Sequence, residues 1–564
     1  MNVADENREP AAPNLPASGK TGLAIAAVGV GAVALASCGS NSSPTPIAPP
    51  VVVVPVVRPT ATQAARILAQ ATMGAVSADN QKIQSLGFDG WITEQFNTPR
   101  TIAHWDWLVG AGYNTAANIN SQAGFEPTLW RQLIGGSDQL RQRTGMALLD
   151  FIVVGIDGIA SSWKQFAAAA YLDVLMDNAF GNYRTLLDAI TTNAGMAYFL
   201  TFIGNKKANP ATSSEPDENY ARELMQLFTL GLYQLNPDGT QKLANGAPIE
   251  TYTQDDVSGL ARVWTGWNLD SKDNTTPDRF RRPLANVAAD HETGTKSFLG
   301  TTIPLNTSGV DSKKLALDAI FAHPNIAPFV ARQLIQRLVT SNPSPAYVGR
   351  VSARFADNGS GVRGDMKAIL RAVLLDTEAR DDAAAAASAS FGKLRDPILR
   401  LTGWARAFGA TSPSDTWPIG NTSSSAARLA QSPGRSPSVF GWFRPGYTPP
   451  NSAIANAALV APEFQLASEP TVVAYINYMQ SLITNGAGDF KADYAAILAK
   501  AADSQALLDD INFNLAANQI GSATLAQIKT AVDSISGGTP AGLSNRLYTA
   551  ILLTLASPEY LVLK

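Results

Sequence analysis

The feature that most constrains the fold of this chain is the helical spacing of its apolar residues, which recurs from Ala61 to the C-terminus. Ala64, Ile67, Leu68 and Ala71 lie three or four positions apart along the chain, the spacing of one helix face. No sustained alternation of apolar and polar residues is present, and strands do not alternate regularly with helices. The sequence therefore predicts a mainly α fold with long irregular loops and at most minor β structure.

The same spacing predicts the positions of individual elements. Short strands are expected around Ile303 and over residues 241–249. Residues 381–390 are predicted to form either a frayed helix or a loop, and residues 411–438, rich in Ser, Pro and Gly, a long loop crossing the surface. Beyond the opening helix, further helices are predicted over residues 146–156, 163–176, 183–190, 315–321, 326–339, 366–375, 397–408, 471–479, 494–501 and 545–555.

Composition narrows the classes of partner and of chemistry. The 43 basic and 46 acidic residues give a formal net charge of -3, and no run of Lys or Arg is present. A nucleic-acid partner is therefore not expected. The chain has one cysteine, which excludes an internal disulfide, and three histidines, which limits the donors for a transition metal. No metal site is assigned.

The N-terminal residues carry the signals of export. Residues 22–36 form an uncharged apolar run, and a helix of this length rises about 22 Å, short of the roughly 30 Å hydrocarbon core of a bilayer. The run predicts a signal peptide over residues 1–37. Leu35-Ala36-Ser37-Cys38 resembles the bacterial lipobox, whose cysteine is acylated. This resemblance implies lipidation of Cys38; the alternative is a chance cysteine beside a signal peptide.

Residues 38–59 are rich in Ser and Pro, which predicts a semi-rigid extended tether between Cys38 and a folded domain. Gly39 follows the cysteine, where an Asp would suggest retention in the inner membrane. The lipobox resemblance therefore favours the outer membrane. We expect an exported lipoprotein of the cell envelope whose first partner is the lipid membrane.

A polar helix is predicted between Ser214, as its N-cap, and Leu230-Gly231, where Gly supplies a left-handed end. One half of this helix is apolar, and the other half carries Glu218, Asn219, Arg222, Glu223 and Gln226. Glu218 with Arg222, and Asn219 with Glu223, are spaced for an ion pair and a hydrogen bond. The polar half is either a solvated face or a strip that lines a cleft and holds a ligand.

A second helix is predicted after Thr253, which forms a capping box with Asp256. Val257, Leu260, Ala261 and Trp264 then follow at core spacing. Asp256 is expected to be a cap, which leaves Asp255 and Arg262 freer to act on a ligand. Trp267, just beyond the helix, is a candidate ligand contact, although such a residue more often fills a core.

The third polar stretch is Asp290-His291-Glu292-Thr293-Gly294-Thr295-Lys296. A histidine flanked by two acids suits a hard cation or a general base. It also suits an ordinary loop held by hydrogen bonds. Both interpretations stay open at this point.

These stretches together resemble a family of large bacterial exported proteins of unknown function, the DUF1800 family. The likeness runs in order from Ala61 to the C-terminus and is specific in combination. It rests on residues 66–74, 179–187, 196–200, 218–225, 229–231, 252–257, 261–262, 265–267, His291, Gly294, Lys296, 299–300, 436–447 and 557–560.

The resemblance implies one large multi-helical domain over residues 60–564. It also implies a second exported protein encoded nearby as a partner, and it brings no established activity or cofactor. Two positions depart from the family pattern: Phe228 stands where many relatives carry His, and Glu292 where many carry Asp. The loss of a histidine at position 228 weakens the metal interpretation.

Two functions, besides a purely structural role, are compatible with the sequence, which lacks the Walker, dinucleotide-binding, HExxH, CxxC and GxSxG motifs. The first is a membrane-anchored envelope protein that binds a partner protein or an extracellular polymer. The second is an envelope hydrolase that uses a cleft of carboxylate, arginine and histidine groups. Candidate catalytic residues are Glu218, Arg222, Glu223, Asp255 and His291, and candidate ligand-binding residues are Asn219, Arg262, Trp267 and Lys296.

Overall fold

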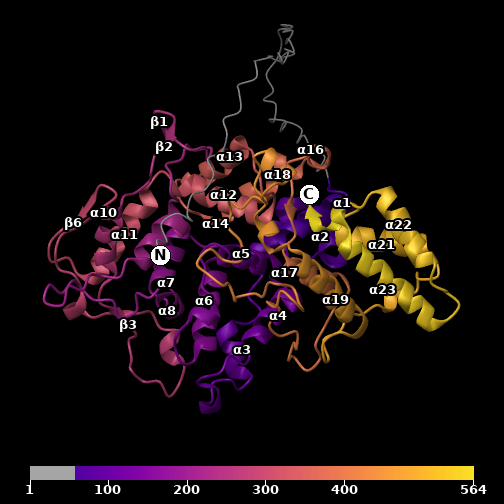
Figure 1. The fold of residues 1–564 in the computed structure, drawn as a ribbon, viewed down its shortest axis with the longest axis horizontal. Coiled ribbons are helices and arrows are strands. Elements are labelled where there is room, and N and C mark those ends of the chain that lie inside the picture. The colour runs from indigo at the N-terminus through magenta and orange to yellow at the C-terminus, as the bar shows by residue number, and fades with distance from the viewer. Residues whose placement is uncertain (1–57) are drawn as a thin grey trace, which may run out of the picture. The chain divides into compact units, whose positions relative to one another are not determined.

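The computed structural model describes residues 58–564. The predicted signal peptide, Cys38 and nearly all of the predicted tether lie outside the described residues. Within residues 58–564 the chain forms 24 α-helices and four two-stranded antiparallel sheets, and this stretch is a single compact unit. The predicted mainly α class is therefore confirmed (Figure 1).

Helix α1 (Ala61–Ala71) shows how local sequence sets these elements. Thr60 accepts the backbone N–H of Gln63, and the Gln63 side chain accepts the N–H of Thr60, so a capping box fixes the start. The predicted apolar stripe of this helix is buried. Helix α2 (Ser77–Asn97) packs against α1, and it bends at Gly87, where φ is 78°.

The first half of the domain is a helical body around a buried aromatic core. Trp91, Trp130 and Trp163 are fully buried in it. Helix α6 packs against α3, α5, α7 and α8 and so forms the centre of this body (Figure 1). The helices of this body that follow α2 are α3 (His104–Gly110), α4 (Phe125–Gly135), α5 (Gln139–Leu149), α6 (Lys164–Asn178), α7 (Tyr183–Thr191) and α8 (Ala194–Phe199).

The middle of the chain combines short helices with three of the four small sheets. Helix α9 (Asn219–Glu223) continues directly into a π-helical turn over Leu224–Thr229, and α10 (Gln254–Ala261) packs against α9. The sheets pair β1 (Leu243–Ala244) with β2 (Ala247–Pro248), β3 (Trp267–Asn268) with β4 (Ala285–Asn286), and β5 (Lys296–Phe298) with β6 (Thr301–Ile303).

The second half returns to helices. Strand β7 (Lys393–Leu394) pairs with β8 (Val562–Leu563), so two segments of this half that lie far apart in the sequence are joined. Helices α21, α22 and α23 lie at the end of the unit opposite α10 and α11 (Figure 1). The helices are α11 (Gly309–Ala322), α12 (Ile326–Leu338), α13 (Pro345–Ala356), α14 (Met366–Leu375), α15 (Thr377–Arg380), α16 (Asp382–Ala387), α17 (Pro397–Ala407), α18 (Ala453–Asn456), α19 (Glu469–Asn485), α20 (Ala495–Leu498), α21 (Ser504–Ala516), α22 (Ser522–Asp533), α23 (Pro540–Ala556) and α24 (Pro558–Leu561).

Two predicted elements are wrong in part. The helix predicted over residues 146–156 ends at Leu149, because the chain turns at residues 150–152 and Ile156 donates its N–H to the carbonyl of Gly434. The loop over residues 411–438 is irregular, as predicted, but it does not stay on the surface. Residues 429–436 are buried, and Arg435 pairs there with Glu126 and Asp157.

Among residues 58–564, no helix combines the length and the apolar character needed to cross a membrane.

Candidate functional site

The carboxylate of Glu218, just before α9, is the centre of a polar cluster. It accepts hydrogen bonds from Arg222 Nη2 at 2.9 Å, from Gln254 Nε2 at 2.8 and 2.9 Å, and from Ser258 Oγ at 2.6 Å. The predicted Glu218–Arg222 ion pair is thus present, and two side chains from α10 complete it. We call Glu218, Arg222, Gln254 and Ser258 the α9–α10 strip.

Local sequence places both helices of the strip. The predicted capping box holds at Thr253, whose Oγ1 accepts the N–H of Asp256 while the Asp256 carboxylate accepts the N–H of Thr253. The predicted cap at Ser214 is wrong. The Asp217 carboxylate accepts the N–H of Asn219 and so starts α9, whereas Ser214 pairs through its backbone with Asn209.

The α9–α10 strip is half-exposed. The side chain of Glu218 is 31% exposed and that of Arg222 is 38% exposed. Asp255 and Arg262, on and just after α10, are exposed beside it. Asn219 donates to Thr201 Oγ1 at 3.3 Å, so the predicted bond between Asn219 and Glu223 does not form.

Glu223 differs from its neighbours because it is buried. Its side chain was predicted on the polar half of the helix, yet the residue is only 7% exposed and its Oε2 has no hydrogen-bond partner. Burial raises the pKa of Glu223 to about 7, and the positive charge of Arg222 opposes this rise. A carboxyl group in that range changes charge near neutral pH and is suited to proton transfer.

His291 is also buried. Its Nδ1 lies 3.0 Å from the carbonyl oxygen of Thr265, and a carbonyl only accepts, so the proton is assigned to Nδ1. Its Nε2 is therefore an unprotonated nitrogen, buried without a partner. Burial lowers the pKa of His291, and the charge of Lys296 lowers it further, so the ring is neutral at pH 7.

The remaining predicted residues surround His291. Lys296 is fully buried on β5 and its Nζ donates to the carbonyl of Gly294 at 3.4 Å. Burial lowers the pKa of Lys296, Glu292 opposes this effect, and Arg262 adds to it. Trp267 is buried and fills the core, which the sequence left open as the alternative to a ligand contact. Lys313 Nζ lies 5.5 Å from the centre of its ring.

Helix α10 lies between these two groups. Its Gly259 packs on β5 so closely that an added Cβ would lie 1.8 Å from the carbonyl oxygen of Ser297. Ser258 belongs to the α9–α10 strip, and Arg262 lies one turn further along, within electrostatic reach of Lys296. No hydrogen bond or ion pair within residues 58–564 joins Glu218 to His291. The predicted residues therefore form two separate groups, one at α9 and one near β5, and α10 packs against both elements.

A second polar cluster, which the sequence did not indicate, lies in the core. Lys393 on β7 is buried, and its Nζ contacts Glu463 Oε1 at 2.9 Å, the carbonyl oxygen of Arg337 at 2.9 Å and Asp396 Oδ1 at 3.6 Å. Arg143 donates to the same Arg337 carbonyl at 2.6 Å. With Asp150, these residues form what we call the core charge cluster.

The core charge cluster is balanced, because it contains three cations (Arg143, Arg337 and Lys393) and three acids (Asp150, Asp396 and Glu463). Burial raises the pKa of Asp150 to about 7, and the neighbouring Asp396 adds to the rise. Burial likewise raises the pKa of Glu463, opposed by Lys393. Such a cluster persists only where each charge keeps its partners.

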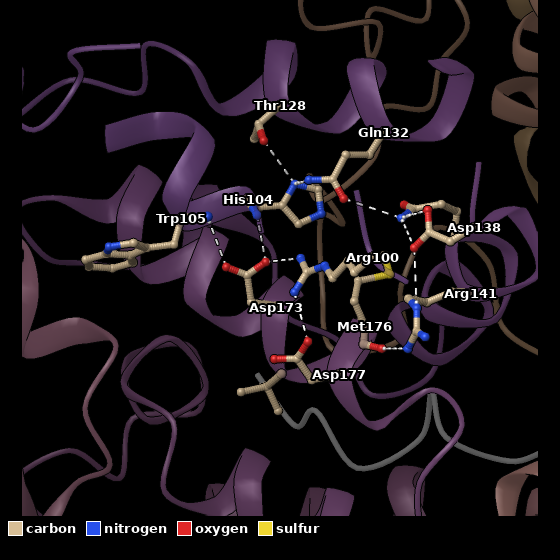
Figure 2. A network of polar contacts seen from close by, with 12 residues as sticks. Arg100, His104, Trp105, Thr128, Gln132, Asp138, Arg141, Asp173, Met176 and Asp177 are labelled. Carbon is tan, nitrogen blue, oxygen red and sulfur yellow. Dashed lines mark hydrogen bonds and ion pairs between the residues drawn. The ribbon is translucent and has the colours of Figure 1, made fainter. Parts of the chain in front are cut away.

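A third network joins four helices around His104 (Figure 2). The carboxylate of Asp173 on α6 accepts the N–H groups of His104 at 2.8 Å and Trp105 at 3.0 Å, so it caps α3 from another helix. Arg100 pairs with Asp173 and also with Asp177. This part of the network satisfies a helix end, which is a structural role.

The ring of His104 is fixed from α4. Its Nδ1 lies 3.1 Å from both Thr128 Oγ1 and Gln132 Nε2. The Gln132 Oε1 accepts from Gln142, so Gln132 Nε2 is the donor to the ring and the proton of His104 is assigned to Nε2. Burial, with Arg100 as a second cause, lowers the pKa of His104, so this ring stays neutral.

Within residues 58–564, no three His, Cys, Asp or Glu side chains are grouped so that they could hold a metal ion. The fold and its clusters thus define a large, mainly helical domain with one half-exposed and two buried polar networks. A sequence model described as "Protein of unknown function (DUF1800)" matches residues 66–562, and the chain belongs to this family. No curated protein and no solved structure matches the chain.

Proposed function

We propose that this member of the DUF1800 family is an exported envelope protein, anchored through a lipid on Cys38, that binds a partner protein through the α9–α10 strip. The anchor rests on the Leu35-Ala36-Ser37-Cys38 sequence after an apolar run. The Ser- and Pro-rich residues 38–59 are the predicted tether between this anchor and the domain. By the lipobox resemblance, the membrane is the outer membrane, and a second exported protein encoded nearby is the first candidate partner.

One observation carries the binding proposal: the polar groups of the α9–α10 strip are fixed and half-exposed at the same time. Glu218 is held by three different side chains and keeps 31% of its own side chain exposed. Preorganised polar groups lose little freedom when a partner binds. Because the strip and its exposed neighbours Asp255 and Arg262 present both signs of charge, they suit a protein surface of complementary charge.

The test is co-purification from detergent-solubilised membranes after gentle crosslinking. We expect the wild-type chain to carry a stoichiometric partner, and the double variant Arg222→Glu, Asp255→Lys to lose it. A matched control reverses the exposed pair on α22 in Lys529→Asp, Asp533→Lys and should keep the partner. Recovery of the wild-type chain only as a free monomer would overturn the proposal. Recovery of a polymer in place of a protein would assign the strip to the extracellular polymer.

A second candidate function, an envelope hydrolase, is favoured by Glu223 alone. This carboxyl group is buried, its Oε2 is unpartnered, and its pKa is raised to about 7, as for a general acid or base. Arg222 is adjacent and carries the positive charge that would hold an anionic intermediate. His291 contributes less to this function because it is buried and bonds to Thr265, with no hydrogen bond to Glu223 or Arg222.

The hydrolase candidate is tested by incubating the purified chain with isolated cell-envelope fractions and analysing released fragments by mass spectrometry. Glu223→Gln preserves the shape of the side chain and removes the titrating group. If the function is correct, fragments are released by the wild type and not by Glu223→Gln. Equal release by both proteins excludes Glu223 as the catalytic group.

A further inference from the structure

A groove lies between α19 and α23, far along the chain from the α9–α10 strip. Its volume is about 320 Å³, in the range of sites that hold small ligands. Helix α19 lines the groove on one side and α23 on the other, and Ile535, which follows α22, also contributes to the lining. Its lining residues are Gln480, Ile483, Thr484, Ile535, Asn545, Tyr548, Thr549 and Leu552.

The lining of the groove is polar without being charged. It contains two primary amides, two threonines and one tyrosine, and no Asp, Glu, Lys, Arg or His. Within residues 58–564, the side chains of Gln480, Asn545, Tyr548 and Thr549 make no hydrogen bond to another group of the chain. Their donors and acceptors are therefore free for a ligand, and each amide offers both kinds.

The same groove offers an apolar surface. The ring of Tyr548 is supported from behind by Tyr494, with ring centres 5.8 Å apart and planes inclined at 60°. Ile483, Ile535 and Leu552 supply aliphatic carbon beside it. An aromatic ring carries an apolar face with a polar tip, so it can cover carbon–hydrogen surface while its hydroxyl bonds outward.

We propose that this groove binds a neutral saccharide. A sugar ring combines a face of carbon–hydrogen groups with an edge of hydroxyl groups. In this groove the face can pack on the Tyr548 ring and the aliphatic side chains, and the hydroxyl groups can bond to the free amides and hydroxyls. An anionic or cationic ligand finds no counter-charge in the lining. The inference goes beyond the partner proposed for the α9–α10 strip, because it concerns a different surface and a different class of ligand.

The experiment is calorimetric titration of the full-length chain, solubilised in a detergent without a sugar headgroup. The probes are maltohexaose, cellohexaose and hexa-N-acetylchitohexaose, with hexagalacturonate as the charged comparison. We expect at least one neutral probe to bind and hexagalacturonate not to bind. Tyr548→Ala should weaken the binding at least tenfold, and Asn545→Ala, which removes an exposed amide, several-fold.

Gln480→Ala changes a residue that lines the groove and should weaken the binding. Its matched control is Gln505→Ala, which changes an exposed glutamine on α21 outside the groove and should bind as the wild type does. The double variant Arg222→Glu, Asp255→Lys should bind the saccharide normally, which separates this inference from the partner proposal. No binding of any neutral probe at millimolar concentration overturns the inference. Wild-type affinity in both Asn545→Ala and Gln480→Ala also overturns it, and these surface changes leave the fold intact.

Discussion

The α9–α10 strip and the core charge cluster are built from the same kinds of residue in opposite surroundings. Glu218 and Arg222 face water and share their contacts with uncharged side chains of α10. Lys393, Glu463 and Asp396 are sealed in the core, where the attraction between charges must offset the loss of their hydration. The comparison teaches that the cost of losing one partner of an ion pair depends on the surroundings of the other partner. The cost is large where the remaining charge is buried and small where water can reach it.

The largest effect is expected from Lys393→Met in the core charge cluster. The substitution leaves the carboxylates of Glu463 and Asp396 buried without their central cation. We expect the free energy of unfolding to fall by about 3–5 kcal/mol, measured by urea denaturation. The control Lys529→Met, in the exposed pair with Asp533, should change it by less than about 0.5 kcal/mol. Equal losses in both variants would contradict the comparison.

Glu223 sharpens the comparison, because its side chain is buried although it lies on α9, the helix that carries part of the half-exposed α9–α10 strip. Its folded pKa of about 7 lies above the ordinary value of 4.5, so the folded state binds the proton more tightly than the unfolded state. Stability is then fully present below about pH 4.5 and is lost as pH rises to about 7. Glu223→Gln removes this loss and should stabilise the protein at pH 8 by on the order of 2–3 kcal/mol.

The measurement for Glu223→Gln is the urea midpoint at pH 5 and at pH 8. The difference between variant and wild type should be larger at pH 8 than at pH 5. If Glu223→Gln stabilises the protein equally at both pH values, ionisation of Glu223 does not lower the stability of the folded state, which would contradict the prediction.

A third prediction concerns the junction that separates the two polar groups. Gly259→Ala places a methyl group against the Ser297 carbonyl and forces α10 away from β5. We expect a loss of about 1–3 kcal/mol and weaker binding of the partner proposed for the α9–α10 strip. Gly521→Ala, where an added Cβ meets nothing within 4 Å, is the control; it replaces the N-cap residue of α22, so it should cost less than about 1 kcal/mol and leave the binding unchanged.

The smallest effect on stability is expected at the α9–α10 strip itself. Glu218→Gln should cost less than about 1 kcal/mol, because the group is half-exposed and water replaces the lost contacts. The cost should shrink further at 1 M salt, as expected for screened charges. A loss as large as that of Lys393→Met would show that the strip is part of the structural core and would remove the reason for proposing it as a binding surface.

Local patterns in the sequence predicted much of the fold and only part of the site. Helix α14 has the predicted bounds, and the capping box at Thr253 is where the sequence indicates it. These features depend on residues within a few positions of one another. The burial of Glu223 was missed because it lies at the border of the polar half of its helix, where neighbouring elements decide which side faces the core.

The core charge cluster was out of reach for a different reason. Its members come from α5, α12, β7 and the segment near Glu463, which lie far apart in the sequence and meet only in the fold. One signal was available: Arg337 lies three positions after Leu334 and seven after Val330, on the buried face of α12. A charged residue at an apolar position indicates a buried partner, although it does not say which residue that partner is.

The pairing of β7 with β8 has a consequence for the order in which the molecule is assembled. Arg66 on α1 donates to the carbonyl of Lys564 at 2.9 Å, so α1 contacts the residue that follows β8. During synthesis Arg66 emerges 498 positions before the residue that it contacts. Helix α1 therefore folds without this contact until residue 564 has been synthesised, and any step that depends on the contact comes late in synthesis.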